Sequence, residues 1–158
     1  MARHISATFV DPTRMRVEAR GRRGAMAMDS APPDGDGTAI SPREALLGAL
    51  AGCTSMDVAS ILRKKRQVVD RYDLEVHGEE ATEHPQLFVA ITVEHVIAGD
   101  VDPEAVRRSV ELSATRYCPV SALLSKGVKI EHRYRLTRRD GTEHAALVVV
   151  TGPGDAHA

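Results

Sequence analysis

A capped, apolar helix is the feature that most constrains how this chain can fold. Ser41-Pro42-Arg43-Glu44 is a capping box with proline at the first helical position. The Ser41 hydroxyl can accept from the N–H of Glu44, and the Glu44 carboxylate can accept from the N–H of Ser41. The pattern predicts a helix over residues 42–67. Its apolar positions recur every three or four residues, in a stripe of Leu47, Leu50, Thr54, Val58 and Ile61.

The middle of this helix is built from small residues. Gly48, Ala49, Ala51 and Gly52 would let another backbone approach closely. A sheet built by so short a chain can cover only one side of such a helix. We therefore expect a partner on the other side, which indicates a homodimer.

Strands are expected on both sides of the helix. Residues 4–10 and 15–20 alternate polar and apolar positions around a turn and predict a β-hairpin. Further alternating runs cover 72–79, 87–97 and 128–136, and a last strand over 145–150 is expected to return after the hairpin signal Asp140-Gly141. Two shorter helices are expected at 103–115 and 119–127. The order predicts an α+β fold, in which an antiparallel sheet packs on the long helix. We expect one domain over residues 1–150 and a flexible tail over 151–158.

Composition excludes several classes of partner. The net charge of −1 gives no general attraction to nucleic acid or to an anionic membrane. No apolar run is expected to reach the roughly 18 residues of a membrane helix, and the first residues lack the apolar stretch of a signal peptide. We expect a cytoplasmic protein, where a functional disulfide is usually transient. Two cysteines far apart in the sequence do not fit a four-ligand zinc site, and no metal or cofactor is expected.

The two cysteines are the strongest candidates for chemistry. Cys53 lies three turns into the long helix, where a free cysteine is often only a small buried apolar residue. Cys118 precedes Pro119 at a predicted helix start, a position that lowers a thiol pKa. It could equally be a capping residue that happens to be cysteine. From position alone, a redox pair is plausible and no more.

Two segments together resemble a known family. SPREALLGALAGCTSMDVASILRKKRQ and the later SATRYCPVSALLSKGVKI resemble the OsmC/Ohr superfamily, in a divergent branch of it. The resemblance implies an intertwined homodimer with two active sites at the subunit interface. It implies that Cys53 attacks an organic hydroperoxide or hydrogen peroxide, that Cys118 resolves the sulfenic acid as a disulfide, and that an external dithiol restores both thiols.

The same resemblance implies a cation beside the thiolate. In the family an arginine from the N-terminal region, oriented by a glutamate on the long helix, has this role, and Arg22 aligns best with it. Arg43 stands where that glutamate is expected, and Glu44 is one residue later, about 100° around the helix. Glu44 could be only a capping partner. Asp57, one turn after Cys53, could orient Arg22 instead or could oppose thiolate formation.

The sequence is therefore compatible with two functions. The first is a thiol-dependent peroxidase that acts on organic hydroperoxides or hydrogen peroxide through Cys53 and Cys118. The resemblance implies that such a peroxidase takes part in organic hydroperoxide resistance and the stress response. The alternative is a non-catalytic dimer of the same fold that binds a small lipophilic molecule at its interface.

Overall fold

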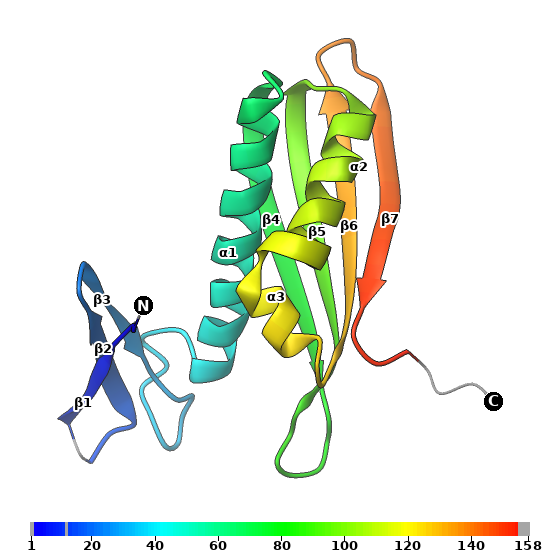
Figure 1. Ribbon diagram of the computed structural model, residues 1–158. Coiled ribbons are helices and arrows are strands. Elements are labelled where there is room, and N and C mark those ends of the chain that lie inside the picture. The colour runs from blue at the N-terminus through cyan, green and yellow to red at the C-terminus, as the bar shows by residue number, and fades with distance from the viewer. Residues whose placement is uncertain (1, 12, 155–158) are drawn as a thin grey trace. The chain divides into compact units, whose positions relative to one another are not determined.

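The computed structural model describes residues 2–11 and 13–154. The chain forms two compact units, Met1–Leu46 and Leu47–Ala158, which are described separately. The elements are labelled in Figure 1. Helix α1 (Pro42–Lys64) begins in the first unit, and its residues from Leu47 onward belong to the second.

The N-terminal unit contains a three-stranded antiparallel sheet. Its strands follow one another in the order β1 (Ser6–Asp11), β2 (Arg16–Gly21) and β3 (Gly24–Met28). The predicted hairpin is confirmed, and β3 was not predicted. Gly21 pairs with Gly24, so Arg22 and Arg23 form the two-residue turn between β2 and β3.

A buried aspartate organises the loop after β3. Asp29 is 2% exposed and accepts from the N–H of Ser30 and from both the N–H and the hydroxyl of Thr38. The backbone N–H of Thr38 is the main cause that holds the pKa of Asp29 below its ordinary value. The two ends of the loop over residues 30–38 are thus joined by one side chain.

The predicted capping box begins α1. The N–H of Ser41 donates to Glu44 Oε2 at 2.7 Å, and the N–H of Glu44 donates to Ser41 Oγ at 3.2 Å. The helix ends at Lys64 rather than at the predicted Gln67, because Arg66 adopts a left-handed conformation with φ of 58°. The N–H groups of Arg66 and Gln67 then bond back to the carbonyls of Arg63 and Leu62, which closes the helix.

By length and composition alone, α1 could cross a membrane. The expectation that no segment meets this criterion is therefore wrong. A core helix meets the same criterion, and α1 buries one stripe in the core, made of Leu50, Thr54, Val58 and Leu62.

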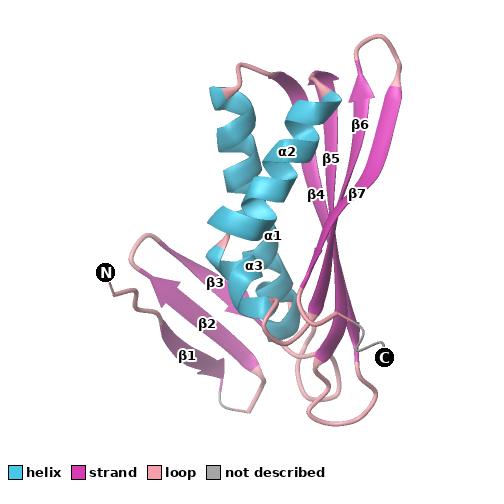
Figure 2. Cartoon of the chain, turned by 45° about the vertical axis from the view of Figure 1, so that its right-hand side comes forward, coloured by secondary structure: helices cyan, strands magenta, loops and turns pink. Residues whose placement is uncertain are grey.

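The C-terminal unit is a four-stranded sheet with helices on one face (Figure 2). Its strand order is β4-β5-β6-β7. The strands are β4 (Val68–Glu80), β5 (Phe88–Asp100), β6 (Lys129–Arg138) and β7 (Glu143–Thr151). Strand β7 includes the first residue of the predicted flexible tail, and residues 155–158 lie outside those described.

The α+β fold is confirmed, with one difference in strand direction. Strands β4 and β5 are antiparallel, as are β6 and β7, whereas β5 and β6 are parallel. A parallel neighbour requires a long crossover. Here the crossover is α2 (Pro103–Leu112), a π-helical turn (Ser113–Tyr117) and α3 (Pro119–Leu124).

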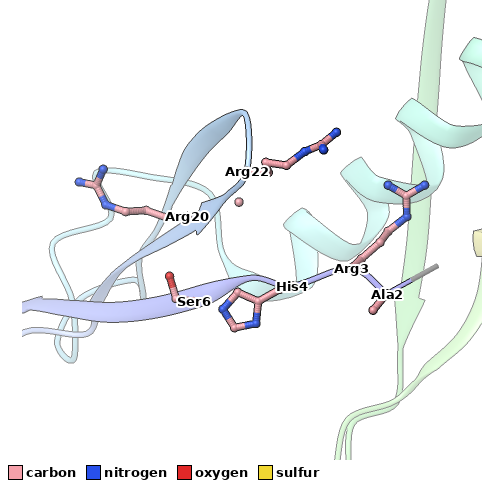
Figure 3. Close-up of a pocket in the computed structure, with 7 residues that line it drawn as sticks. Ala2, Arg3, His4, Ser6, Arg20 and Arg22 are labelled. Carbon is pink, nitrogen blue, oxygen red and sulfur yellow. The ribbon is translucent and has the colours of Figure 1, made fainter.

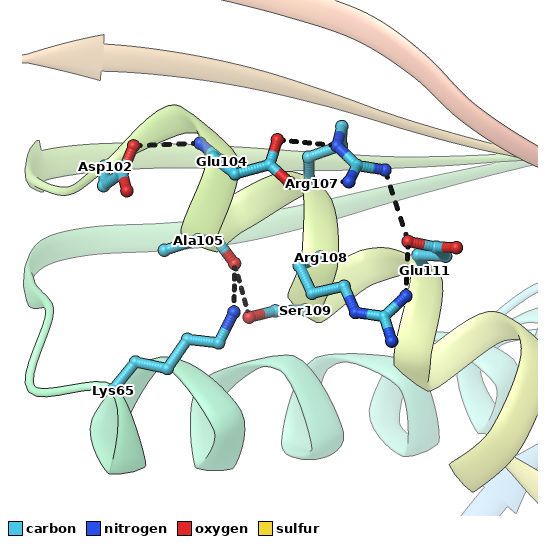
Figure 4. A network of polar contacts seen from close by, with 8 residues as sticks. All are labelled: Lys65, Asp102, Glu104, Ala105, Arg107, Arg108, Ser109 and Glu111. Atoms are coloured by element: carbon cyan, nitrogen blue, oxygen red, sulfur yellow. Dashed lines mark hydrogen bonds and ion pairs between the residues drawn. The ribbon is translucent and has the colours of Figure 1, made fainter.

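Helix α2 is held by its cap and by surface charges (Figure 4). Asp102 caps its N-terminus by accepting from the N–H of Glu104. Arg107 pairs with Glu104 and Glu111. From the end of α1, Lys65 Nζ donates to the carbonyl of Ala105 at 3.5 Å. The exposed ion pairs each contribute little to stability, so packing beneath α2 is what fixes it on the sheet.

Two apolar clusters form the core of this unit. One lies under α2 and contains Val58, Leu62, Val106 and Val110 among others. The other contains Leu50, Ile91, Val93, Val128, Ile130 and Cys118, with Cys53 packed against it. The second cluster therefore brings together two cysteines that are distant in the sequence.

Candidate functional site

The two predicted reactive cysteines are neighbours. Both are free thiols, and their Sγ atoms and a carboxylate oxygen of Asp57 all lie within 4.8 Å of one another. Cys53 and Asp57 come from consecutive turns of α1. Cys118 is the N-cap of α3, where the π-helical turn ends. The pairing therefore depends on the crossover between β5 and β6.

Cys118 is buried and firmly held. Cys118 is 2% exposed. The N–H of Ser121 donates to its Sγ at 3.3 Å, and the Thr54 hydroxyl donates at 3.5 Å. These donors fix one position of the sulfur next to α1.

Cys53 is half-buried and resists ionisation in a single chain. Burial, above all, raises its pKa to about 11. The side chain of Cys118 and the charge of Asp57 contribute to this rise in the pKa, while the backbone N–H of Val120 opposes it. Because the thiolate is the nucleophile of cysteine chemistry, catalysis at Cys53 requires an additional cation.

Asp57 occupies the position predicted for it, one turn after Cys53. The Ser113 hydroxyl donates to Asp57 Oδ2 at 3.2 Å, so the carboxylate is fixed by the π-helical turn. Within the described part of the C-terminal unit, no arginine or lysine pairs with it. Its proposed role in orienting Arg22 stays a prediction.

Arg22 and Glu44 belong to the N-terminal unit. Glu44 is the capping partner of Ser41, one of the two roles considered for it, and the Ser41 N–H lowers the pKa of its carboxyl. Arg22 lines a hollow of about 780 Å³ together with Arg3, His4 and Arg20, and the three guanidinium groups point in different directions (Figure 3). The roles of Arg22 and Glu44 in chemistry stay predictions.

A buried polar pair was missed by sequence reasoning. Tyr72 OH and His95 Nδ1 lie 2.6 Å apart on neighbouring strands. Burial, with a smaller contribution from the nearby His132, lowers the pKa of His95 to about 3. Burial also raises the pKa of Tyr72, and the charge of Asp57 adds to this effect. The signal was the alternation of β5, which places position 95 on the covered face.

His132, on β6, lies on the same covered face of the sheet as His95. It is fully buried, its Nε2 lies 3.4 Å from Ser121 Oγ, and burial lowers its pKa to about 4. Its Nδ1 and the Nε2 of His95 are buried without a hydrogen-bond partner among the described residues. Ser121 therefore links the two residues, because its hydroxyl contacts His132 and its N–H donates to Cys118 Sγ.

Comparison with known proteins shows the family of this chain. A family model for OsmC-like proteins matches residues 35–133, a range that includes both cysteines. The chain belongs to the OsmC-like protein family. The expected resemblance is therefore confirmed.

Relatives of this OsmC-like protein include both sequences and solved structures. Protein YhfA of Escherichia coli K12 is 41% identical over 99 residues, which are 62% of this chain and 74% of YhfA. A hypothetical protein from Aquifex aeolicus superposes with a TM-score of 0.79 at 22% identity, covering 88% of this chain and 98% of its own. An organic hydroperoxide resistance protein OsmC from Legionella pneumophila superposes with a TM-score of 0.62 at 15% identity, covering 84% and 95%. The two structures show a shared fold.

Proposed function

We propose that this OsmC-like protein is a thiol-dependent peroxidase that reduces organic hydroperoxides or hydrogen peroxide through Cys53 and Cys118. One observation carries the proposal: the two Sγ atoms lie within 4.8 Å of each other although the cysteines are far apart in the sequence. A disulfide requires about 2 Å between sulfurs. A rotation of the Cys53 side chain, which is half-buried, is the kind of movement that closes the remaining gap.

The proposed reaction has three steps. The Cys53 thiolate attacks one peroxide oxygen, the O–O bond breaks, and the alcohol leaves after taking a proton from solvent. The resulting sulfenic acid condenses with the Cys118 thiol, which forms the disulfide and releases water. An external dithiol then reduces this disulfide and is itself oxidised. Because this return step needs a reducing compartment, the proposal places the protein in the cytoplasm.

The proposed roles follow the exposure of each thiol. Half-buried Cys53 is the thiol that a peroxide can reach. Cys118 is 2% exposed, so in this proposal it reacts only with the sulfenic acid formed on Cys53. The thiolate carries negative charge and passes it to the departing oxygen during attack, and a guanidinium best stabilises this charge. We assign that part to Arg22, with Asp57 or Glu44 as the acid that orients it.

A homodimer is part of the proposal. Only one stripe of α1 is buried, and large apolar side chains elsewhere in the C-terminal unit are exposed, among them Met56 at 73%, Leu123 at 67% and Tyr117 at 50%. Exposed apolar surface of this extent commonly marks an interface. A second copy would cover it and could supply the cation. Sedimentation at micromolar concentration should show a dimer, and a single 17.1 kDa species would contradict it.

A thiol count tests the catalytic proposal. One equivalent of cumene hydroperoxide should remove two thiols per chain in the wild type. Cys53→Ser should consume no peroxide. Cys118→Ser should complete one fast turnover and then carry a sulfinic or sulfonic adduct on Cys53, found by mass spectrometry. Oxidation of Cys118 with Cys53 untouched would reverse the two roles, and unchanged thiols in the wild type would refute the proposal.

One observation favours the alternative of a non-catalytic dimer that binds a small lipophilic molecule. Burial raises the pKa of Cys53 to about 11, so its thiol is largely protonated at pH 7 unless a cation is added. In that case the thiols would stay unchanged with peroxide, and binding of an apolar fluorescent probe would not depend on Cys53.

A further inference from the structure

Three groups that bind soft divalent metals meet at one point of the C-terminal unit. They are the thiols of Cys53 and Cys118 and the carboxylate of Asp57, with one ligand atom of each within 4.8 Å of the others. Peroxide chemistry uses the two sulfurs directly and gives the carboxylate only the indirect part of orienting Arg22. The three groups together are also a set of metal ligands.

The spacing suits a tetrahedral ion. Zinc lies about 2.3 Å from thiolate sulfur and about 2.0–2.2 Å from carboxylate oxygen, so ligand atoms on neighbouring corners are roughly 3.5–3.8 Å apart. The observed limit of 4.8 Å is within about 1 Å of that value. Cys53 and Asp57 are one helical turn apart, so small side-chain rotations can close the gap while α1 stays in place.

Hydrogen-bond donors already hold two of the three groups. The Ser113 hydroxyl donates to Asp57 Oδ2 at 3.2 Å and leaves the other oxygen for a ligand role. The Ser121 N–H and the Thr54 hydroxyl donate to Cys118 Sγ. Such outer contacts orient metal ligands and tune their affinity.

A metal ion would supply the positive charge that two ionised thiols need beside a carboxylate. No lysine or arginine of the described C-terminal unit pairs with Asp57 in that role. We propose that the reduced protein binds one zinc(II) ion per chain through Cys53, Asp57 and Cys118, with a water molecule in the fourth position. Zinc fits because thiolates select soft ions over magnesium or calcium.

This site goes beyond the peroxidase proposal and constrains it. The ion and the disulfide use the same two sulfurs, so they exclude each other. Bound zinc would keep both thiols reduced and would shield Cys53 from peroxide. Zinc would then inhibit turnover, and oxidation of the pair would release the ion.

Cobalt(II) provides a direct test, because it absorbs light when bound to thiolate. The full chain, reduced and freed of metal by a chelator, should bind one cobalt(II) per chain with a sulfur-to-cobalt charge-transfer band, and zinc(II) should displace it. About two protons should be released per ion as the thiols ionise. Cys53→Ser and Cys118→Ser should each weaken the band and the affinity.

Variants of the carboxylate and of its hydrogen-bond donor sharpen the test. Asp57→Ala should lower the affinity at least tenfold. Ser113→Ala keeps all three ligands and should lower it by about 10- to 100-fold. Asp73→Ala removes an exposed acid on β4 and should change nothing.

Three results would overturn the metal site: no charge-transfer band, an affinity unchanged in Asp57→Ala, or binding that persists when both cysteines are replaced. The last result would mean that histidines elsewhere hold the ion. None of these measurements uses peroxide. A failure of the metal site is therefore distinguishable from a failure of the peroxidase proposal.

Discussion

Acidification from pH 7 to pH 5 should destabilise this protein because two neutral histidines lie in its core. His95 and His132 are fully buried, and burial lowers their pKa values to about 3 and about 4. In the unfolded chain both histidines bind protons below the ordinary value of about 6.5. The unfolded state therefore binds more protons than the folded state, so the free energy of unfolding falls as the pH drops from about 6.5 toward 4.

The magnitude follows from these values. Each histidine contributes a slope that approaches about 1.4 kcal/mol per pH unit. Integrated from pH 7 to pH 5, this is about 2 kcal/mol for one histidine and about 4 kcal/mol for two. That is a large part of the roughly 5–15 kcal/mol of a typical domain. Stopping at pH 5 keeps most carboxyl groups ionised, so the histidines dominate the change.

Urea unfolding at a series of pH values measures the slope directly, with chelator present and the protein concentration held constant. Tyr72→Phe combined with His95→Leu replaces both partners of the 2.6 Å contact, which avoids leaving one buried polar group unpaired. This double variant should retain about half of the wild-type slope. His77→Gln, on the exposed side of β4, should retain all of it. A double variant with the full slope would refute the assignment.

Three further substitutions test separate parts of the structure. Leu62→Ala, at a fully buried position under α2, should lower the free energy of unfolding by about 2–5 kcal/mol in denaturant melts, and a loss below about 1 kcal/mol would contradict the packing. Glu44→Gln preserves a capping box, so peroxidase activity and melting temperature should both be kept. Lost activity at unchanged stability would instead assign Glu44 to the site. In metal-free protein, Asp57→Asn should raise the pH midpoint of Cys53 alkylation, because Arg22 would lose the acid proposed to orient it. A fall would show that Asp57 acts only as a repelling charge.

Much of the secondary structure could be predicted because its signals are local. The capping box located the start of α1, and Cys118 with Pro119 located the start of α3. Period-two alternation found β4, β5 and β6. The end of α1 was missed because an arginine, rather than a glycine, adopts the left-handed conformation at Arg66.

The remaining features depend on contacts between distant segments. The predicted helices between β5 and β6 permit a parallel pair, but that these two strands are neighbours in the sheet depends on contacts between distant segments. The position of Asp57 could be predicted from helical spacing, whereas its contact with Ser113 depends on a π-helical turn that has no reliable sequence signal. Alternation places positions 95 and 132 on the covered face of the sheet, but histidine has only an intermediate tendency to be buried, so two neutral core histidines could not be predicted from the sequence.

The meeting of α1 with the crossover also links the oxidation state of the protein to its thermodynamic stability. A bond from Cys53 to Cys118 would close a long loop that runs from the middle of α1 to the start of α3 and includes β4, β5 and α2. Chain-entropy arguments assign such a loop about 4 kcal/mol of stabilisation, acquired by restricting the unfolded ensemble. In the proposed cycle the oxidised protein is then the harder form to unfold, and each reduction returns it to the looser one. Resistance to proteolysis would thus measure the fraction of molecules that contain the Cys53–Cys118 disulfide and have not yet been reduced.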